Sequence, residues 1–170
     1  QARDTTGNGR ADTLSLIDGD GRIRVQEIAP NGSSPPGERL TLAADGSVTR
    51  HCIDGDANGT LEMQVVFEAE MLSLARVDGD GDGRIDSREH YVGGQRARIE
   101  ADTNADGIPD VVQHLKGDEV VRQDEDSDYD GILDRSFEGE EAVPIAADAS
   151  RLEPFGKLAC KSFHGFWKTH

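Results

Sequence analysis

The chain has 170 residues, of which 34 are acidic and 18 basic, so its net charge at pH 7 is −16. This charge argues against nucleic acid as a partner, because binding a polyphosphate requires a basic surface, and no apolar run is long enough to span a membrane. Only 35% of the residues are hydrophobic and 5% aromatic, which predicts a thin core and folding that depends on bound metal.

An acidic pattern of nine residues recurs along the chain. In the clearest copy, residues 78–86, Asp occupies positions 1, 3, 5 and 9, and glycine occupies position 6. Oxygens from positions 1, 3, 5, 7 and 9 are the ligands of a calcium loop, and position 7 contributes its main-chain carbonyl group. Gly83 allows the left-handed backbone that turns such a loop back on itself. The alternative is a polar turn rich in Asp and Gly.

The pattern repeats with a period of about 24 residues, a length typical of repeat arrays. Copies begin at Asp54, Asp102 and Asp126, a weaker copy begins at Asp4, and the copy expected near Pro30 is missing. We therefore expect a repeat array with about four to five Ca²⁺ ions. The predicted ligands are Asp4, Thr6, Asn8, Arg10, Asp12, Asp54, Asp56, Asn58, Thr60, Glu62, Asp78, Asp80, Asp82, Arg84, Asp86, Glu89, Asp102, Asn104, Asp106, Ile108, Asp110, Asp126, Asp128, Asp130, Ile132 and Asp134.

Between the acidic loops, alternating apolar and polar residues flank short turn sequences, which predicts β-hairpins. The turns fall at residues 18–21, 45–46, 93–94, 116–118 and 138–139. The expected fold is therefore mainly β: a tandem array of about six hairpin units, one per period, joined by calcium-binding loops and followed by a C-terminal capping segment.

One unit allows a different prediction. Residues 61–77 contain no turn glycine, and residues 68–72 favour helix. Glu89 falls at position 12 counted from Asp78, where an EF-hand has its bidentate glutamate. An α-helical, EF-hand-like unit around residues 61–100 is therefore the alternative. The hairpin is preferred because a unit of about 24 residues is too short for two helices and a loop.

The repeat pattern ends near Val143. The predicted organisation is a repeat array over residues 1–147 and a capping tail over 148–170, because repeat arrays have an apolar end that needs covering. The tail contains three of the five Phe and the single Trp, so an aromatic partner-binding segment is the alternative.

Two cysteines, Cys52 and Cys160, are present. In an exported protein they suggest one disulfide between the middle of the array and its tail, and two unpaired buried thiols are the alternative. A removed signal peptide or trimming would account for the start at Gln1.

The nine-residue loops resemble those of integrin-like FG-GAP repeats, in which Asp-x-Asp-x-Asp-Gly-x-x-Asp joins two β-strands. They are also similar to the aspartate-rich repeats of thrombospondin type 3 and of many exported bacterial proteins. The resemblance covers the loops beginning at Asp54, Asp78, Asp102 and Asp126. It does not extend to a propeller, because three four-stranded blades are too few. It implies an extracellular or periplasmic, calcium-stabilised module without catalysis, and anchoring to a membrane through a removed N-terminal segment is a further option.

Catalytic signatures are not evident in the sequence. The carboxylates recur at metal spacing in every unit, whereas a catalytic pair would occur once, and HExxH, GxSxG and phosphate-cradling motifs are lacking. His90 and His114 are separated by one full period, so they either share a transition metal or are repeated surface residues.

Three functions follow as hypotheses. The first is a non-catalytic, exported calcium-binding repeat protein that acts as a scaffold or adhesion module and contacts another protein or a cell-surface component. The second is a periplasmic inhibitor or immunity-type protein that presents its acidic face to a basic partner. The third is a calcium sensor of EF-hand type.

Overall fold

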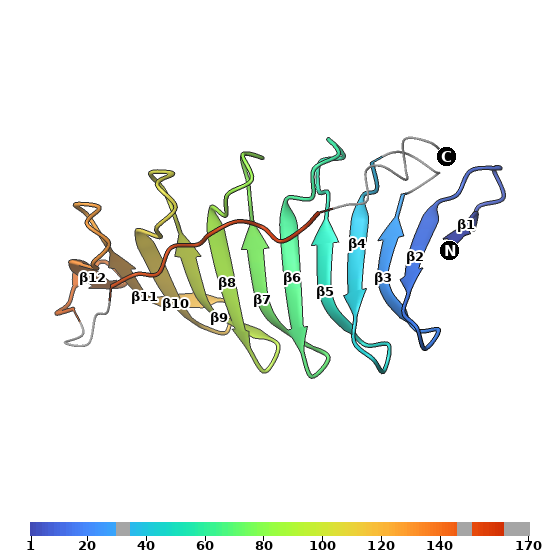
Figure 1. The fold of residues 1–170 in the computed structure, drawn as a ribbon. Helices are drawn as coiled ribbons and strands as arrows, with labels where there is room; N and C mark the ends of the chain where they lie inside the picture. Colours follow the sequence, from blue (N-terminus) through green and yellow to red (C-terminus); the bar gives the residue numbers. More distant parts are fainter. Residues whose placement is uncertain (30–34, 146–150, 162–170) are drawn as a thin grey trace. The chain divides into compact units, whose positions relative to one another are not determined.

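The computed structural model describes residues 1–29, 35–145 and 151–161 and is all β (Figure 1). Thirteen strands form one antiparallel sheet, in which they follow the order of the chain. The predicted hairpin array is therefore confirmed. The strands are β1 (Ala2–Arg3), β2 (Thr13–Ile17), β3 (Ile23–Ile28), β4 (Glu38–Leu42), β5 (Val48–Ile53), β6 (Met63–Glu68), β7 (Met71–Val77), β8 (Ser87–Val92), β9 (Gln95–Ala101), β10 (Val111–Lys116), β11 (Glu119–Glu125), β12 (Arg135–Glu138) and β13 (Glu141–Ala142).

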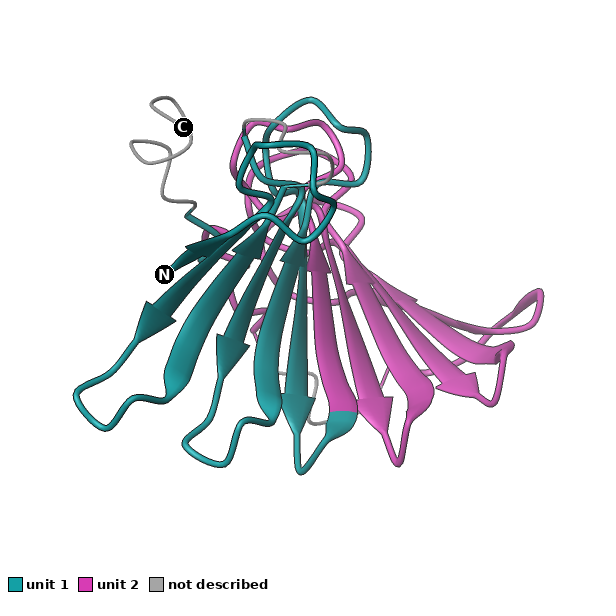
Figure 2. Ribbon diagram, turned by 90° about the vertical axis from the view of Figure 1, so that its right-hand side faces the viewer, with its two compact units in different colours: residues 1–71, 159–170 teal, residues 72–158 magenta. Residues whose placement is uncertain are grey.

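The chain forms two compact units (Figure 2). The first contains residues 1–71 and 159–170, and the second contains residues 72–158. The tail expected as a separate cap is thus divided between the units, and its aromatic residues after position 161 lie outside the described residues. In each unit, tight hairpin turns connect the strands at one end and the acidic loops connect them at the other (Figure 2). No helix in the described part of the chain is long and apolar enough to cross a membrane.

The α-helical alternative for residues 61–100 is wrong. Residues 61–77 contain the two strands β6 and β7. Ala69 and Glu70 turn the chain between them with positive φ angles of 49° and 64°. Two successive left-handed residues are typical of the tight hairpin turn that glycine or asparagine usually forms. The turn exists here without glycine because the cross-strand pairing outweighs the local helix preference of this segment.

Residues better suited to this turn should stabilise the protein. We expect the double substitution Ala69→Asn, Glu70→Gly to raise the free energy of unfolding by about 1 kcal/mol, since it relieves left-handed strain. Gly94→Ala should instead lower the free energy of unfolding, because Gly94, in the β8–β9 turn, has a φ of 79° that alanine adopts only with strain. Urea denaturation in excess calcium measures both, and a loss of stability in the double variant would contradict the strain argument.

A row of facing residues next to the acidic loops forms the buried layer, and it is largely polar. In the first unit the pairing runs from Leu14 through Glu27, Arg39 and Cys52 to Gln64. In the second unit, successive partners are Arg76, Arg88, Glu100, Val112, Asp124 and Ser136. Each strand from β2 to β12 contributes one residue to the row, so these positions recur at intervals of half a repeat. Their charges are compensated, as in the pair of Arg39 and the fully buried Glu27 at 2.9 Å.

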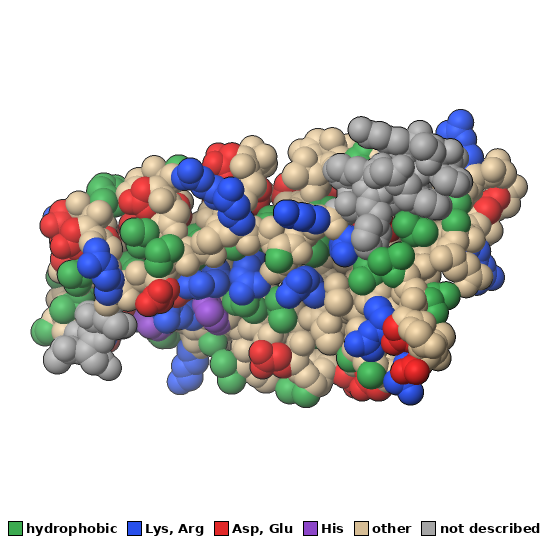
Figure 3. Space-filling model, in the orientation of Figure 1, with side chains coloured by type: hydrophobic (Ala, Val, Ile, Leu, Met, Phe, Trp, Pro, Cys, Tyr) green, Lys and Arg blue, Asp and Glu red, His purple; other side chains and the backbone are tan. Residues whose placement is uncertain are grey.

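Glu100 is the most heavily paired member of this row. Arg88 and His90 on β8 and Arg98 on β9 all contact its carboxylate, which is 4% exposed. Basic and histidine side chains gather over these strands in Figure 3. Burial alone would raise the pKa of Glu100, but the hydrogen bonds from His90 and Arg88 and the charges of Arg98 and Arg88 lower it to about 2.

Glu100→Gln should therefore lower the free energy of unfolding by up to about 3 kcal/mol at pH 7, since the folded state favours the charged carboxylate. Because the pKa is lowered from 4.5 to about 2, this contribution is present above pH 4.5 and is lost as the pH falls toward 2. Urea titrations of wild type and variant across this range check it. Glu119→Gln, at an exposed residue of β11, is the matched control. A wild-type advantage that persists unchanged at pH 2 would contradict the assignment.

Candidate metal centres

All five acidic loops share three internal hydrogen bonds. They are named here loop 4 (residues 4–12), loop 54 (54–62), loop 78 (78–86), loop 102 (102–110) and loop 126 (126–134). In each, the N–H of the position-6 glycine donates to Oδ2 of the position-1 Asp, at 2.6–2.8 Å. The position-2 N–H donates to the position-9 carboxylate at 2.6–3.1 Å. The position-7 N–H donates to Oδ1 of position 5 at 2.7–2.9 Å.

The backbone of each loop contains two left-handed residues. Position 6 is glycine in every loop, with φ between 84° and 95°, so the role predicted for Gly83 is confirmed. Position 4 is also left-handed, including at Ala57, Ala105 and Tyr129, where φ is 61–62°. The sequence gives no signal for these three residues, because none is a residue type that favours this conformation.

Acidic groups converge in three of the loops. Their ligand atoms lie within 4.8 Å of one another in three groups: Asp54, Asp56 and Glu62; Asp78, Asp80 and Asp86; and Asp126, Asp128 and Asp130. Loop 102 has Asn104 at position 3, and loop 4 has Thr6 and Asn8 at positions 3 and 5. These two loops therefore offer fewer carboxylates than loops 78 and 126, although they share the three internal hydrogen bonds.

Several carboxylate oxygens in the loops have no hydrogen-bond partner among the described residues. Asp54 Oδ1, Glu62 Oε1 and Asp102 Oδ1 are buried in this way. In loop 126, the negative charge of Asp130 raises the pKa of Asp128, and burial and the charges of Asp134 and Asp126 add to this effect. Unpaired buried oxygens and mutually repelling carboxylates are costly without a positive charge. The donors are all hard oxygens, so they fit a divalent cation such as Ca²⁺.

At the expected start of the missing copy near Pro30, the backbone makes the same hydrogen bond as in other repeats. The N–H of Ala29 donates to the carbonyl oxygen of Asp12 at 2.8 Å. The same bond joins Asp102 to Asp86 and Asp126 to Asp110, at 2.9 Å. Ala29 therefore stands at position 1 of a loop that has no carboxylate there, and residues 30–34 lie outside the described residues.

The carboxylate of Glu89 binds side chains of β8 and β9 and does not join the acidic group of loop 78. It lies within β8, where its carboxylate accepts hydrogen bonds from Tyr91 Oη at 2.5 Å and from Arg96 Nη1 at 3.2 Å. Asp86, rather than Glu89, joins Asp78 and Asp80 in the acidic group of loop 78. The loop has only nine residues, so position 12, Glu89, already belongs to strand β8 and its side chain lies away from the acidic group.

The two histidines of equal spacing are held by different carboxylates. Nε2 of His90 lies 3.2 Å from Glu100, and Nε2 of His114 lies 2.9 Å from Asp124. Neither belongs to a group of three metal-ligating side chains in the described ranges. The arrangement fits repeated strand residues that pair with the buried row.

Residues 151–161 are named here the strap (Figure 1), and residues 151–157 contact acidic loops of the second unit. In the second unit, the N–H of Leu152 donates to the carbonyl oxygen of Gly131, and the N–H of Phe155 to that of Gly107, both at 2.9 Å. Lys157 forms an isolated antiparallel bridge with Arg84. Leu152 and Phe155 are each 7% exposed. Of the predicted capping tail, the described part thus follows the loops one after another, and the sequence carried no signal for this path.

Cys160 of the strap forms a disulfide with Cys52, whose sulfur atoms are 2.04 Å apart. The predicted pairing is therefore confirmed, and both cysteines lie in the first unit. The amide of Gln64 donates to the sulfur of Cys160 at 3.5 Å, and Arg39 hydrogen-bonds the carbonyl group of Lys161. The strap is thus fixed to the buried row of the first unit by one covalent bond and two hydrogen bonds.

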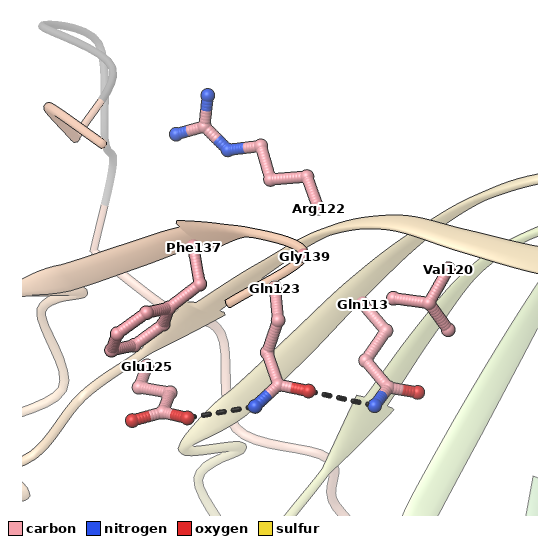
Figure 4. Close-up of a pocket in the computed structure, with 7 residues that line it drawn as sticks. All are labelled: Gln113, Val120, Arg122, Gln123, Glu125, Phe137 and Gly139. Carbon is pink, nitrogen blue, oxygen red and sulfur yellow. Dashed lines mark hydrogen bonds between the residues drawn. The ribbon is translucent and has the colours of Figure 1, made fainter. Parts of the chain in front are cut away.

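An open hollow of about 440 Å³ lies on β10–β12 (Figure 4). Gln113 donates from Nε2 to Gln123 Oε1 at 2.8 Å, and Gln123 donates to Glu125 Oε1 at 2.7 Å. Phe137 lies beside this chain of hydrogen bonds. The polar groups of the hollow bind one another along the sheet, as expected for cross-strand pairs.

Two comparisons with known proteins gave no match. A scan against models of protein families matches none of them, and a search of curated proteins finds no similar sequence.

Proposed function

We propose that the chain is a non-catalytic, exported calcium-binding repeat protein, in which about four to five Ca²⁺ ions hold the acidic loops and the array serves as a scaffold or adhesion module. The observation that carries the proposal is the fivefold recurrence of one loop geometry. Acidic groups converge in three of these loops, and carboxylate oxygens of loops 54 and 102 are buried without a partner among the described residues. A catalytic centre occurs once in a chain, whereas a structural ligand set can recur in every repeat.

Calcium suits these loops better than magnesium. Ca²⁺ accepts six to eight oxygen ligands in flexible geometry, whereas Mg²⁺ needs a smaller octahedral site and retains water. The loops offer side-chain oxygens from positions 1, 3, 5 and 9 and one carbonyl group, a set that water molecules can complete. A bound cation would supply the positive charge that these carboxylates lack.

The disulfide supports export. Disulfides persist in oxidising compartments such as the periplasm and the extracellular space, and are rare in the cytosol. A partner protein or cell-surface component outside the cytoplasm is therefore the proposed target of the scaffold.

Calcium titration by calorimetry tests the proposal. We expect strong sites at loops 54, 78, 102 and 126 and a weaker one at loop 4, and fewer than three ions per chain would contradict it. Asp106→Ala removes the position-5 carboxylate of loop 102 and should weaken that site at least about tenfold, since one charged ligand is lost. Asp45→Ala is the control.

The control residue lies in a turn without converging acids. Asp45 accepts hydrogen bonds from the hydroxyl and the N–H of Ser47, and these bonds, the hydroxyl first, lower its pKa. Asp45→Ala should leave the calcium stoichiometry unchanged. Loss of an ion in Asp45→Ala but not in Asp106→Ala would show that the ligands are assigned to the wrong residues.

A further inference from the structure

The strap is bonded to the same glycines that shape the metal loops. In loop 102, Gly107 donates its N–H to Asp102 Oδ2 at 2.6 Å and accepts from the N–H of Phe155 with its carbonyl oxygen. Gly131 likewise donates to Asp126 Oδ2 at 2.7 Å and accepts from Leu152. In each of these two loops, a single glycine therefore links the strap N–H to the position-1 carboxylate through two hydrogen bonds.

Other strap contacts also reach predicted ligand residues. Arg151 Nη2 donates to the carbonyl oxygen of Asp130, the position-5 residue of loop 126, at 3.2 Å. Lys157 pairs with Arg84, whose carbonyl group is the predicted position-7 ligand of loop 78. The strap thus contacts position 5, 6 or 7 in each of three consecutive loops of the second unit.

Without a bound cation, the loop conformation that the strap contacts is destabilised. Ala105 and Tyr129 are held at φ angles of 62° and 61°, which disfavour residues with a side chain. The carboxylates of Asp126, Asp128 and Asp130 have ligand atoms within 4.8 Å of one another, and their mutual repulsion acts in the same direction. Because cation and strap both favour one loop conformation, binding of either must favour binding of the other by thermodynamic linkage.

We propose that docking of strap residues 151–157 is linked to cation binding, so that the strap is bound when loops 78, 102 and 126 are loaded and detaches when they are empty. This inference rests on the proposed calcium function. It makes the C-terminal segment a calcium-dependent element whose release exposes Leu152, Phe155 and the loop backbone they cover.

The disulfide restricts how far the released strap can move. Cys160 stays bonded to Cys52 while residues 151–157 detach, so the segment remains attached to the chain at both ends. Rebinding of a segment held at both ends loses less chain entropy than rebinding of a free tail, so the disulfide favours it.

Amide hydrogen exchange of Leu152 and Phe155 measures docking directly, because these two N–H groups make the bonds to Gly131 and Gly107. The full-length, disulfide-bonded protein is compared in calcium and in chelator, with calorimetry on the same sample. We expect exchange of both amides to rise at least about tenfold in chelator. Amides in the centres of β8–β11 also exchange faster there, because loss of calcium destabilises the whole array, so the single-loop variants separate strap release from general unfolding.

Single-loop variants test the linkage in excess calcium, where the rest of the array stays loaded. Asp102→Asn should raise exchange at Phe155 more than at Leu152, and Asp126→Asn should do the reverse. Asp4→Asn is the matched control, since among the described residues the strap makes no backbone hydrogen bond to loop 4. Equal exchange at both amides in all three variants would overturn the proposal.

The reciprocal measurement uses a strap variant. Phe155→Ala removes a buried ring that stacks on the guanidinium of Arg88 at 5.0 Å and should weaken calcium binding at loop 102 about threefold to tenfold. The linkage is overturned if Phe155→Ala binds calcium with unchanged affinity. It is also overturned if the wild type binds calcium but the exchange of its Leu152 and Phe155 amides does not change in chelator. Neither result contradicts the proposed calcium function. Absence of calcium binding in the wild type overturns both.

Discussion

Chelation of calcium should remove most of the stability of the protein. A site that is saturated a hundredfold above its Kd stabilises the folded state by about 2.7 kcal/mol, so four such sites contribute roughly 10 kcal/mol. This is as large as the whole free energy of unfolding of an ordinary domain, about 5–15 kcal/mol. The buried layer is too polar to compensate, since Glu27, Gln64, Glu100 and Asp124 occupy positions where apolar side chains would usually lie.

The loss should spread beyond single loops. The N–H of Asp102 donates to the carbonyl oxygen of Asp86, and that of Asp126 to the carbonyl oxygen of Asp110. The last residue of one loop is therefore bonded to the first residue of the next, and each repeat depends on its neighbours. Thermal melting followed by circular dichroism, with calcium and with chelator, checks the prediction. An unchanged Tm after complete removal of metal would contradict it, and addition of magnesium in place of calcium should restore little.

Removal of the disulfide should have the second largest effect. Cys52 and Cys160 are 108 residues apart, and closing a loop of this length lowers the entropy of the unfolded chain enough to contribute about 4–5 kcal/mol. The double variant Cys52→Ala, Cys160→Ala should lose most of this contribution. It also loses the sulfur that accepts a hydrogen bond from Gln64.

Urea denaturation in saturating calcium measures this loss. Wild-type protein treated with reductant is the matched comparison, because it has the same broken crosslink without any substitution. Both samples should be destabilised by similar amounts. A decrease in the free energy of unfolding below about 1 kcal/mol in both samples would contradict this prediction. It would mean that the crosslink hardly lowers the entropy of the unfolded chain.

The repeat period carried most of the fold prediction. A constant spacing with glycine at position 6 located loops 54, 78, 102 and 126, and the Asp-Gly and Gly-Gly turns between them located the hairpins. These features are local, so they can be found without knowledge of the rest of the chain. The segment 61–77 was ambiguous because its turn, Ala69-Glu70, contains neither glycine nor asparagine.

Apart from the disulfide, the long-range contacts could not be predicted from the sequence. The strap consists of irregular chain whose amides bond to loops in earlier repeats, and neither periodicity nor turn chemistry marks such contacts. The buried row is similar: Glu100 and Asp124 look like surface acids until the pairing of strands places Arg88, Arg122 and two histidines around them.

For a related reason, Glu89 contacts Tyr91 and Arg96 rather than the acidic group of loop 78. This residue fitted an EF-hand only because position 12 was counted along the chain. The loop closes at position 9, and the strand that follows carries the side chain of Glu89 to Tyr91 and Arg96. Spacing along the chain therefore predicts ligands within a loop but not beyond the point where a strand begins.

The spacing of the strap contacts constrains how such a chain can change in length. Leu152 and Phe155 are three residues apart, and they bond to Gly131 and Gly107, which occupy the same position in successive loops. Three extended residues span roughly 9–10 Å, about the width of the two strands in one repeat. A duplication or deletion of one repeat in the second unit would therefore have to be matched by a gain or loss of three residues in the strap. The number of repeats in the second unit is therefore coupled to the length of the strap, and a change in one requires a matching change in the other.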